Sequence, residues 1–185
     1  VILCLPDEAA KATVALLDDA GNTRTRVIDA STAHRTAPGW VYGFAEMTRT
    51  QRAAIAASTR VSNPGCYPTG FIALVRPLRE RGLLPADHPA TVHAVSGYSG
   101  GGKKMIESFE RPQAGVAAPQ AFGAYGLGMN HKHLGEMQQH GLLAAKPIFV
   151  SEYSSLNYIL NEFKKHRLNL AVSLMSTARP SASSP

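Results

Sequence analysis

Short apolar runs alternate with a stretch of helical periodicity at the start of the chain, and this alternation constrains the fold most. Val1–Leu5 is a continuous apolar run of the kind found in strands buried on both faces of a parallel sheet. Apolar residues then recur at helical spacing, at Ala10, Val14 and Leu17, and a short strand, Arg26–Ala30, follows. This order predicts an α/β fold, with a parallel sheet and helices outside it. In such folds, ligands gather at the carboxyl ends of the strands.

The same pattern continues along the chain. Further strands are predicted at Thr59–Ser62, Thr91–Val95 and Pro147–Val150. Helices are predicted at Thr50–Ala57 and from Cys66 to about Gly82, with Pro77 bending or splitting the second of them. These elements extend the α/β pattern to about residue 150.

The two ends of the chain have their own character. Because the chain begins inside an apparent buried strand, we expect that a segment before Val1 has been lost. Ser151–Ser173 reads as an amphipathic stretch whose helical face is formed by Tyr153, Leu156, Leu160 and Phe163. Ser176–Pro185 consists largely of Ser, Ala and Pro, and we expect it to be disordered.

One turn presents a cysteine at the start of a predicted helix. Ser62–Gly70 reads Ser-Asn-Pro-Gly-Cys-Tyr-Pro-Thr-Gly and leads into an apolar run. If Cys66 begins the helix, unpaired N–H groups and the positive end of the helix dipole stabilise its thiolate, which makes it a candidate nucleophile. The alternative is an inert thiol in a tight turn. The turn alone favours that alternative, because a buried cysteine usually behaves as a small hydrophobe.

A polar turn, Ser31-Thr32-Ala33-His34-Arg35, follows the second predicted strand. It stands where ligands collect in a parallel sheet, and two hydroxyls with a guanidinium suit an anion. A capped turn with a solvated arginine is the alternative.

A glycine-rich loop, Ser96–Lys104, follows the predicted strand Thr91–Val95. Its glycines let the backbone approach a ligand closely, while hydroxyls, N–H groups and lysines serve as partners for an anion. The loop is not a P-loop, because Lys104 stands where that motif requires Ser or Thr. The alternative is a flexible loop with solvated lysines.

Histidines cluster late in the chain. His133, Glu136, Met137 and His140 recur at helical spacing, so several of them share a face. His131 and His133 suggest a metal pair, but we expect no metal site, because no third ligand stands at a recognisable spacing. Histidines of this kind serve either as structural residues or in proton transfer.

Composition excludes several classes of protein. The formal net charge of the 185 residues is +6, but the basic residues are scattered and form no stripe, so nucleic acid is not an expected partner. No apolar run approaches the roughly 20 residues that span a bilayer, so we expect no membrane partner. Cys4 and Cys66 lack CxxC spacing and follow no secretory leader, which favours a reducing, cytoplasmic compartment.

Taken together, these motifs resemble the N-acetyl-gamma-glutamyl-phosphate reductase family, in its shorter variety. The resemblance rests on Asn63–Thr69, Ser96–Lys104 and His131–Met137, with support from Asp29–Arg35 and Trp40–Thr48, and it runs from Val1 to about Val150. It implies a partial Rossmann-type parallel sheet joined to an α/β catalytic domain with a mixed sheet. The implied divisions are residues 1–62 for the remnant of the NADP-binding domain, 63–150 for the catalytic domain and 151–185 for a divergent, partly disordered tail.

The resemblance implies an oxidoreductase of arginine biosynthesis that uses NADPH to convert N-acetyl-glutamyl phosphate into N-acetyl-glutamate semialdehyde. The Cys66 thiolate would attack the acyl carbon and expel phosphate, leaving a thioester that is then reduced. A general acid/base with a pKa near neutrality must move the protons. The resemblance assigns that role to His131, with His133 as the second choice.

The resemblance also implies binding roles. Arg35, with Ser31 and Lys103, would bind the departing phosphate, since a guanidinium suits a bidentate grip. Asn63 would order the thiolate or the substrate, and Glu136 would orient His133 or contact the substrate. The residues expected against the nicotinamide of the cofactor are Ser96, Gly97, Ser99 and Gly100.

Two departures from the family leave alternatives open. The glycine-rich turn that seats the cofactor pyrophosphate has no counterpart here, and the similarity stops near Val150. A non-catalytic fragment is therefore the second hypothesis, and a related acyl-phosphate reductase such as an aspartate-semialdehyde dehydrogenase is the third. Tyr67 and Pro68 after the cysteine, together with the paired histidines, favour the acetylglutamyl family. We expect its intact members to be homo-oligomers. A cysteine hydrolase is the least favoured alternative, because it would need no glycine-rich cofactor loop.

Overall fold

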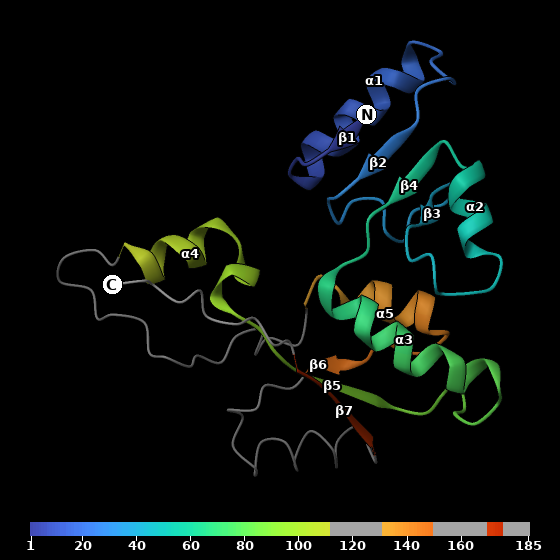
Figure 1. Ribbon diagram of the computed structural model, residues 1–185, viewed down its shortest axis with the longest axis vertical. Helices are drawn as coiled ribbons and strands as arrows, with labels where there is room; N and C mark the ends of the chain where they lie inside the picture. Colours follow the sequence, from blue (N-terminus) through green and yellow to red (C-terminus); the bar gives the residue numbers. More distant parts are fainter. Residues whose placement is uncertain (112–130, 150–169, 176–185) are drawn as a thin grey trace, which may run out of the picture. The chain divides into compact units, whose positions relative to one another are not determined.

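The computed structural model (Figure 1) describes residues 1–111, 131–149 and 170–175. The chain divides into two compact units. The first unit is built from Val1–His88 and Lys132–Pro147, the second from Pro89–His131 and Ile148–Pro185. Elements of the first unit are β1 (Ile2–Leu3), α1 (Asp7–Asp19), β2 (Val27–Asp29), β3 (Val41–Tyr42), α2 (Gln51–Ala57), β4 (Arg60–Ser62), α3 (Cys66–Glu80) and α5 (Leu134–Gly141). Those of the second are β5 (Ala90–Val95), the 3₁₀ turn η1 (Tyr98–Gly101), α4 (Lys103–Glu110), β6 (Ile148–Phe149) and β7 (Leu170–Met175).

A four-stranded parallel sheet organises the first unit. Its strand order is β1-β2-β4-β3, so β2 lies between β1 and β4. α1 connects β1 to β2, and β3 and α2 lie in the chain between β2 and β4. Parallel strands joined through helices confirm the predicted α/β fold.

α1 covers one part of this sheet. It begins directly after Pro6, and its first turn carries Asp7 and Glu8, which are favourable near the positive end of the helix dipole. The spacing of apolar residues noted in the sequence gives α1 a buried side. That side joins the sheet in a core formed by Leu3, Ala10, Val14 and Val27, against which Leu17 and Trp40 pack.

The prediction that the first strand is buried on both faces is wrong. β1 is the edge strand of the sheet, and although Leu3 is buried, Ile2 is 69% exposed. Its neighbour in the register, Ile28, is 43% exposed. The apolar run therefore forms an edge strand covered on one face only.

The predicted helix that starts at the cysteine is confirmed as α3. It ends at the Arg81 cap, and Gly82 adopts a positive φ of 68°, which glycine tolerates without strain. The helix continues through Pro77 and is not split. α5 packs against α3, as Figure 1 shows, and a Cβ on Gly141 would lie only 3.2 Å from Phe71 Cε1. The buried apolar residues of the two helices are Tyr67, Pro68, Phe71, Ile72, Val75, Leu134 and Met137.

The second unit holds a parallel sheet of order β6-β5-β7. We expected a mixed sheet, whereas the strands that the structure describes here all pair in parallel. α4 was not predicted, because the glycines before it gave no sign of a helix. β7 occupies part of a region read as an amphipathic stretch, and the helical face assigned to Tyr153, Leu156, Leu160 and Phe163 lies outside the described residues.

The two compact units do not test the functional division that we predict at residues 62 and 150, which we keep as a proposal. Within the described part of the chain, no helix is long and apolar enough to cross a membrane.

Candidate active site

Cys66 is the first residue of α3, and it is exposed to solvent. β4 delivers the chain to this turn, where the Asn63 N–H donates to the carbonyl of Asp29 at 2.7 Å. Gly65 is the residue that precedes the helix, with φ −72° and ψ 153°. Its carbonyl accepts hydrogen bonds from the Thr69 N–H at 3.1 Å and from Thr69 Oγ1 at 2.9 Å. The turn thus presents the thiol at a helix start, as predicted.

A buried carboxylate holds the other side of the Gly65 peptide. The Gly65 N–H donates to Glu136 Oε2 at 3.0 Å, and the Tyr42 hydroxyl donates to the same oxygen at 2.8 Å. Arg35 Nη1 donates to Glu136 Oε1 at 2.9 Å. The side chains of Arg35 and Glu136 are 9% and 3% exposed, so this ion pair is almost fully removed from solvent. Four segments of the first unit therefore meet at one carboxylate.

Two aromatic groups support this cluster. The pKa of the Tyr42 hydroxyl is raised above its ordinary value, first because the group is buried and then because Glu136 is close, so it stays a donor at neutral pH. His140 stacks on Tyr42 with ring centroids 3.8 Å apart. His140 Nε2 lies 2.8 Å from the carbonyl of Arg35, which can only accept, so Nε2 carries the proton. Burial lowers the pKa of His140, which keeps the ring neutral.

His133 lies against the same turn. A Cβ built on Gly65 would be 2.9 Å from His133 Nε2, which places this nitrogen beside the residue that precedes Cys66. His133 is buried, and its ring meets that of Tyr67 edge to face with centroids 5.9 Å apart. His133 therefore lies next to the turn that carries Cys66.

The polar turn after β2 is strongly tied to its own strand. Asp29 is fully buried and accepts hydrogen bonds from Ser31 N at 2.9 Å, from Ser31 Oγ at 2.7 Å and from His34 Nδ1 at 2.6 Å. His34 in turn stacks on Trp40 with centroids 4.0 Å apart. Thr32 donates to Asp7 through its N–H at 2.9 Å and through its hydroxyl, and these bonds lower the pKa of Asp7.

Arg35 is the member of this turn that best fits an anion. Its Nη2 donates to the carbonyl of Ala30 at 3.1 Å and its Nη1 to Glu136, but its buried Nε has no hydrogen-bond partner among the described residues. The solvated arginine that we considered from the sequence is wrong, since Arg35 is only 8% exposed. A buried charged donor without an acceptor is a position where a ligand oxygen gains binding energy.

The glycine-rich loop belongs to the second unit. It leaves the carboxyl end of β5, forms η1 and passes through Gly102, whose φ of 79° favours glycine, into α4. A Cβ on Gly100 would lie 2.4 Å from Ser96 Oγ, so any side chain there would force the Ser96 hydroxyl to rotate away. Lys103 opens α4 and is 89% exposed, with Glu107 3.8 Å away. The loop is therefore a compact turn with an accessible cation beside it.

The predicted site residues divide between the two units. The first unit holds Ser31, Arg35, Asn63, Cys66, His133 and Glu136, and the second holds Ser96, Gly97, Ser99, Gly100, Lys103 and His131. The structure brings Arg35, His133 and Glu136 together around Gly65, whereas Ser31 points its hydroxyl at Asp29. Sequence reasoning gave no role to Tyr42 and missed the pairing of His140 with Arg35. Tyr42 lay in the supporting segment Trp40–Thr48, which was the one available signal.

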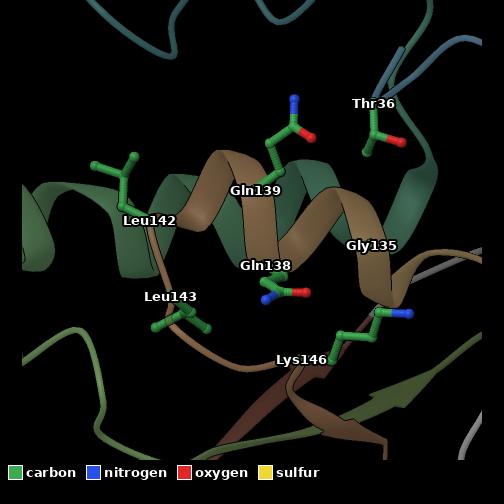
Figure 2. Close-up of a pocket in the computed structure, with 7 residues that line it drawn as sticks. All are labelled: Thr36, Gly135, Gln138, Gln139, Leu142, Leu143 and Lys146. Atoms are coloured by element: carbon green, nitrogen blue, oxygen red, sulfur yellow. The ribbon is translucent and has the colours of Figure 1, made fainter. Parts of the chain in front are cut away.

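A separate hollow of about 490 Å³ lies along α5 (Figure 2). Its lining residues are Thr36, Gly135, Gln138, Gln139, Leu142, Leu143 and Lys146. None of the predicted site residues lines it. In the described part of the chain, no group of three or more His, Cys, Asp or Glu side chains is arranged to hold a metal ion.

Sequence comparison finds close relatives. A reductase from Pseudomonas putida, N-acetyl-gamma-glutamyl-phosphate reductase 2, is 56% identical over 154 residues, and the reductase of Brucella suis is 58% identical over 149. A third, from Nostoc sp., is 54% identical over 152 residues. The chain belongs to the N-acetyl-gamma-glutamyl-phosphate reductase family. The matched regions cover 83%, 80% and 80% of this chain but 48%, 47% and 46% of the relatives, so the chain spans about half the length of the reductases it matches.

Two further comparisons each find a similar protein or domain. The semialdehyde dehydrogenase dimerisation domain matches residues 66–156, which begin at Cys66. Among solved structures, aspartate semialdehyde dehydrogenase II from Vibrio cholerae, in complex with ASA, gives a TM-score of 0.41 at 17% identity, over 81% of this chain and 45% of that one.

Proposed function

We propose that the chain carries the nucleophile of an NADPH-dependent reductase that converts N-acetyl-glutamyl phosphate into N-acetyl-glutamate semialdehyde. The observation that carries this proposal is the accessible thiol of Cys66 at the first residue of α3, in a chain that belongs to this reductase family. A thiolate at a helix start is stabilised by free N–H groups and by the helix dipole.

In the proposed reaction, Cys66 Sγ attacks the acyl carbon of the substrate. The bond from that carbon to the phosphate oxygen breaks, phosphate leaves with the electron pair, and a thioester remains on Sγ. When bound, NADPH supplies the hydride that reduces the thioester carbon. Breaking the carbon–sulfur bond then releases the aldehyde and regenerates the thiolate of Cys66.

We propose a histidine as the group that moves the protons. His131 has this role by family resemblance, and His133 is the second candidate. The position of His133 Nε2 beside Gly65 supports the second candidate. Neutral imidazole suits the task, because its ordinary pKa lies close to neutral pH. Separate His131→Asn and His133→Asn variants should distinguish them through the pH dependence of aldehyde formation.

We propose Arg35 as the main phosphate-binding group, with Ser31 and Lys103 assisting and with Asn63 ordering the substrate. The unpaired, buried Nε of Arg35 supports this role, because an oxyanion would give that donor an acceptor. The Ser31 N–H and hydroxyl both donate to Asp29, so Ser31 would assist only if one of these hydrogen bonds were exchanged for the phosphate.

The glycine loop fits a nicotinamide cofactor. It leaves the carboxyl end of a parallel strand, lies largely on the surface and has no side chain at Gly97 or Gly100 to keep a flat ring away. We propose that Ser96, Gly97, Ser99 and Gly100 hold the nicotinamide end of NADPH. The match to a dimerisation domain supports a homo-oligomer, and the two free thiols fit a reducing compartment such as the cytoplasm.

Acylation of Cys66 tests the proposal without the cofactor. The purified chain is mixed with N-acetyl-glutamyl phosphate, and the release of phosphate and the mass of the protein are followed. We expect one equivalent of phosphate and an acyl adduct on Cys66, retained in a Cys4→Ser variant and absent in Cys66→Ser. No adduct on Cys66 would refute the proposal, and an adduct without saturable NADPH binding would identify a chain that acylates but cannot complete the reduction.

A further inference from the structure

Glu136 makes contacts that a substrate-binding role does not explain. Its Oε1 accepts a hydrogen bond from Arg35 and its Oε2 accepts two, from the Tyr42 hydroxyl and from the Gly65 N–H. Glu136 is 2% exposed, and each of its oxygens faces a donor from the protein. Both oxygens are already used, and all three donors come from the protein itself.

We propose that Glu136 is a positioning residue for Cys66, acting through the Gly65 N–H, and that Tyr42 and Arg35 hold Glu136 in place for this task. The proposal rests on the proposed function in one respect, since it takes Cys66 as the nucleophile. In this proposal, Glu136 does not contact the substrate. Its role is to hold the turn that carries the thiol.

The Gly65 peptide is fixed on both sides. Its N–H is held by Glu136 at 3.0 Å, and its carbonyl is held by the backbone and the hydroxyl of Thr69. Cys66 follows directly, so the direction of its Cα–Cβ bond depends on this peptide. A nucleophile must stay within a fraction of an ångström of its productive position, and the positive end of a helix dipole favours a thiolate only where the turn holds it at the helix start.

The three donors around Glu136 require a carboxylate. An ionised carboxylate only accepts hydrogen bonds, whereas an amide presents one acceptor and one donor group. With glutamine at this position, the amide nitrogen would face either Arg35 Nη1 or the Gly65 N–H, and two donors would then oppose each other. Glu136→Gln therefore breaks at least one of the contacts while it preserves the size of the side chain.

The electrostatic effect of the same substitution has the opposite sign. Removing the negative charge of Glu136 leaves the positive charge of Arg35 uncompensated, and a nearby positive charge favours a thiolate. If Glu136 acted only through its charge, Glu136→Gln would make Cys66 more reactive. If it positions the turn, the substitution makes Cys66 less reactive, so the direction of the change separates the two roles.

The test is the rate of Cys66 alkylation by iodoacetamide, measured between about pH 7 and pH 9 in a Cys4→Ser background, which removes the other exposed thiol. We expect Glu136→Gln to slow alkylation at pH 7 by about tenfold, and Tyr42→Phe by about threefold, as loss of hydrogen bonds to a charged group predicts. The ratio of the rates at pH 7 and pH 9 should fall as well, which simple loosening of the fold would not produce. Tyr42→Phe keeps the ring that stacks on His140, so this variant retains the packing.

Glu46→Gln is the matched control. Glu46 also forms an ion pair with an arginine, Arg52, at 2.9 Å, but the two side chains are 66% and 77% exposed. Its alkylation profile should equal that of the parent. An unchanged or faster rate in the Tyr42→Phe and Glu136→Gln variants would overturn the proposal, and Tyr42→Phe alone decides if Glu136→Gln does not fold. A parent Cys66 no more reactive than free cysteine would instead count against the proposed function, so the two failures are distinguishable.

Discussion

Gly65→Ala should destabilise the first unit through a steric effect that can be worked out from the structure. A Cβ at this position would lie 2.8 Å from Arg35 Nη1, 2.9 Å from Glu136 Oε1 and 2.9 Å from His133 Nε2. The backbone is not the cause, because φ −72° and ψ 153° are open to any residue. The three atoms are ends of side chains, but they are buried and two of them bind each other, so they cannot simply move away.

The expected loss is about 1 to 3 kcal/mol, the range for overpacking a buried site. Gly135→Ala is the matched control, since its Cβ would find Thr36 Cγ2 at 3.9 Å, which is ordinary contact. Gly135 lies in α5, where alanine is the better helix former, so this variant should gain up to about 1 kcal/mol.

Urea unfolding followed by the fluorescence of Trp40 measures both effects. Trp40 is the one tryptophan of the chain and packs against the core of the first unit, so its signal reports on that unit. With a slope of about 1 to 3 kcal/mol per molar, Gly65→Ala should lower the midpoint by roughly 1 M, while Gly135→Ala holds or raises it. A midpoint for Gly65→Ala at or above that of the parent would show that the cluster is not rigid and would refute the reasoning.

Three further measurements follow from the structure. Burial lowers the pKa of His140 below its ordinary 6.5, so as the pH falls the His140 ring is protonated in the unfolded chain before it is protonated in the folded chain. The urea midpoint should therefore drop between about pH 7.5 and 5.5. His140→Gln should flatten that dependence. The hydrogen bonds from Thr32 lower the pKa of Asp7 from 3.8, so Asp7 contributes stability above this value that is lost at lower pH, and Asp7→Asn should remove this part of the acid sensitivity seen by circular dichroism. Lys103→Ala should raise the acyl phosphate concentration for half-maximal phosphate release by about threefold without slowing Cys66 alkylation, and an unchanged concentration would remove Lys103 from the phosphate site.

The sequence predicted the parts of this site that depend on local signals. The start of α3 is predicted by signals that all lie in one short segment. These signals are Gly65 before Cys66 and the apolar residues at helical spacing after it. β2, the strand before the polar turn, was likewise predicted from the residues of its own segment. α4 was missed for a local reason too, since Gly100, Gly101 and Gly102 mask a helix that begins immediately after them.

The cluster around Glu136 was out of reach for the opposite reason. Its hydrogen bonds join residues 71, 94 and 101 positions apart, and no periodicity relates them. The sequence suggested that Arg35 is either solvated or an anion-binding residue, yet it is buried against a carboxylate from α5. Such pairings follow from how α3 and α5 pack against the sheet's polar turn, which propensities of single segments do not contain.

Arg35 links the two proposals made for this chain. Its Nη1 and Nη2 are occupied by Glu136 and by the carbonyl of Ala30, while Nε is the donor left for an oxyanion. One guanidinium can thus steady the turn that carries Cys66 through one side and meet the phosphate that leaves Cys66's substrate through another. Removing the carboxylate partner of a buried arginine is strongly destabilising, because the remaining charge is then uncompensated. Removal of Glu136 should therefore disturb phosphate binding as well as the thiol, whereas removal of the Tyr42 hydroxyl should affect the thiol alone.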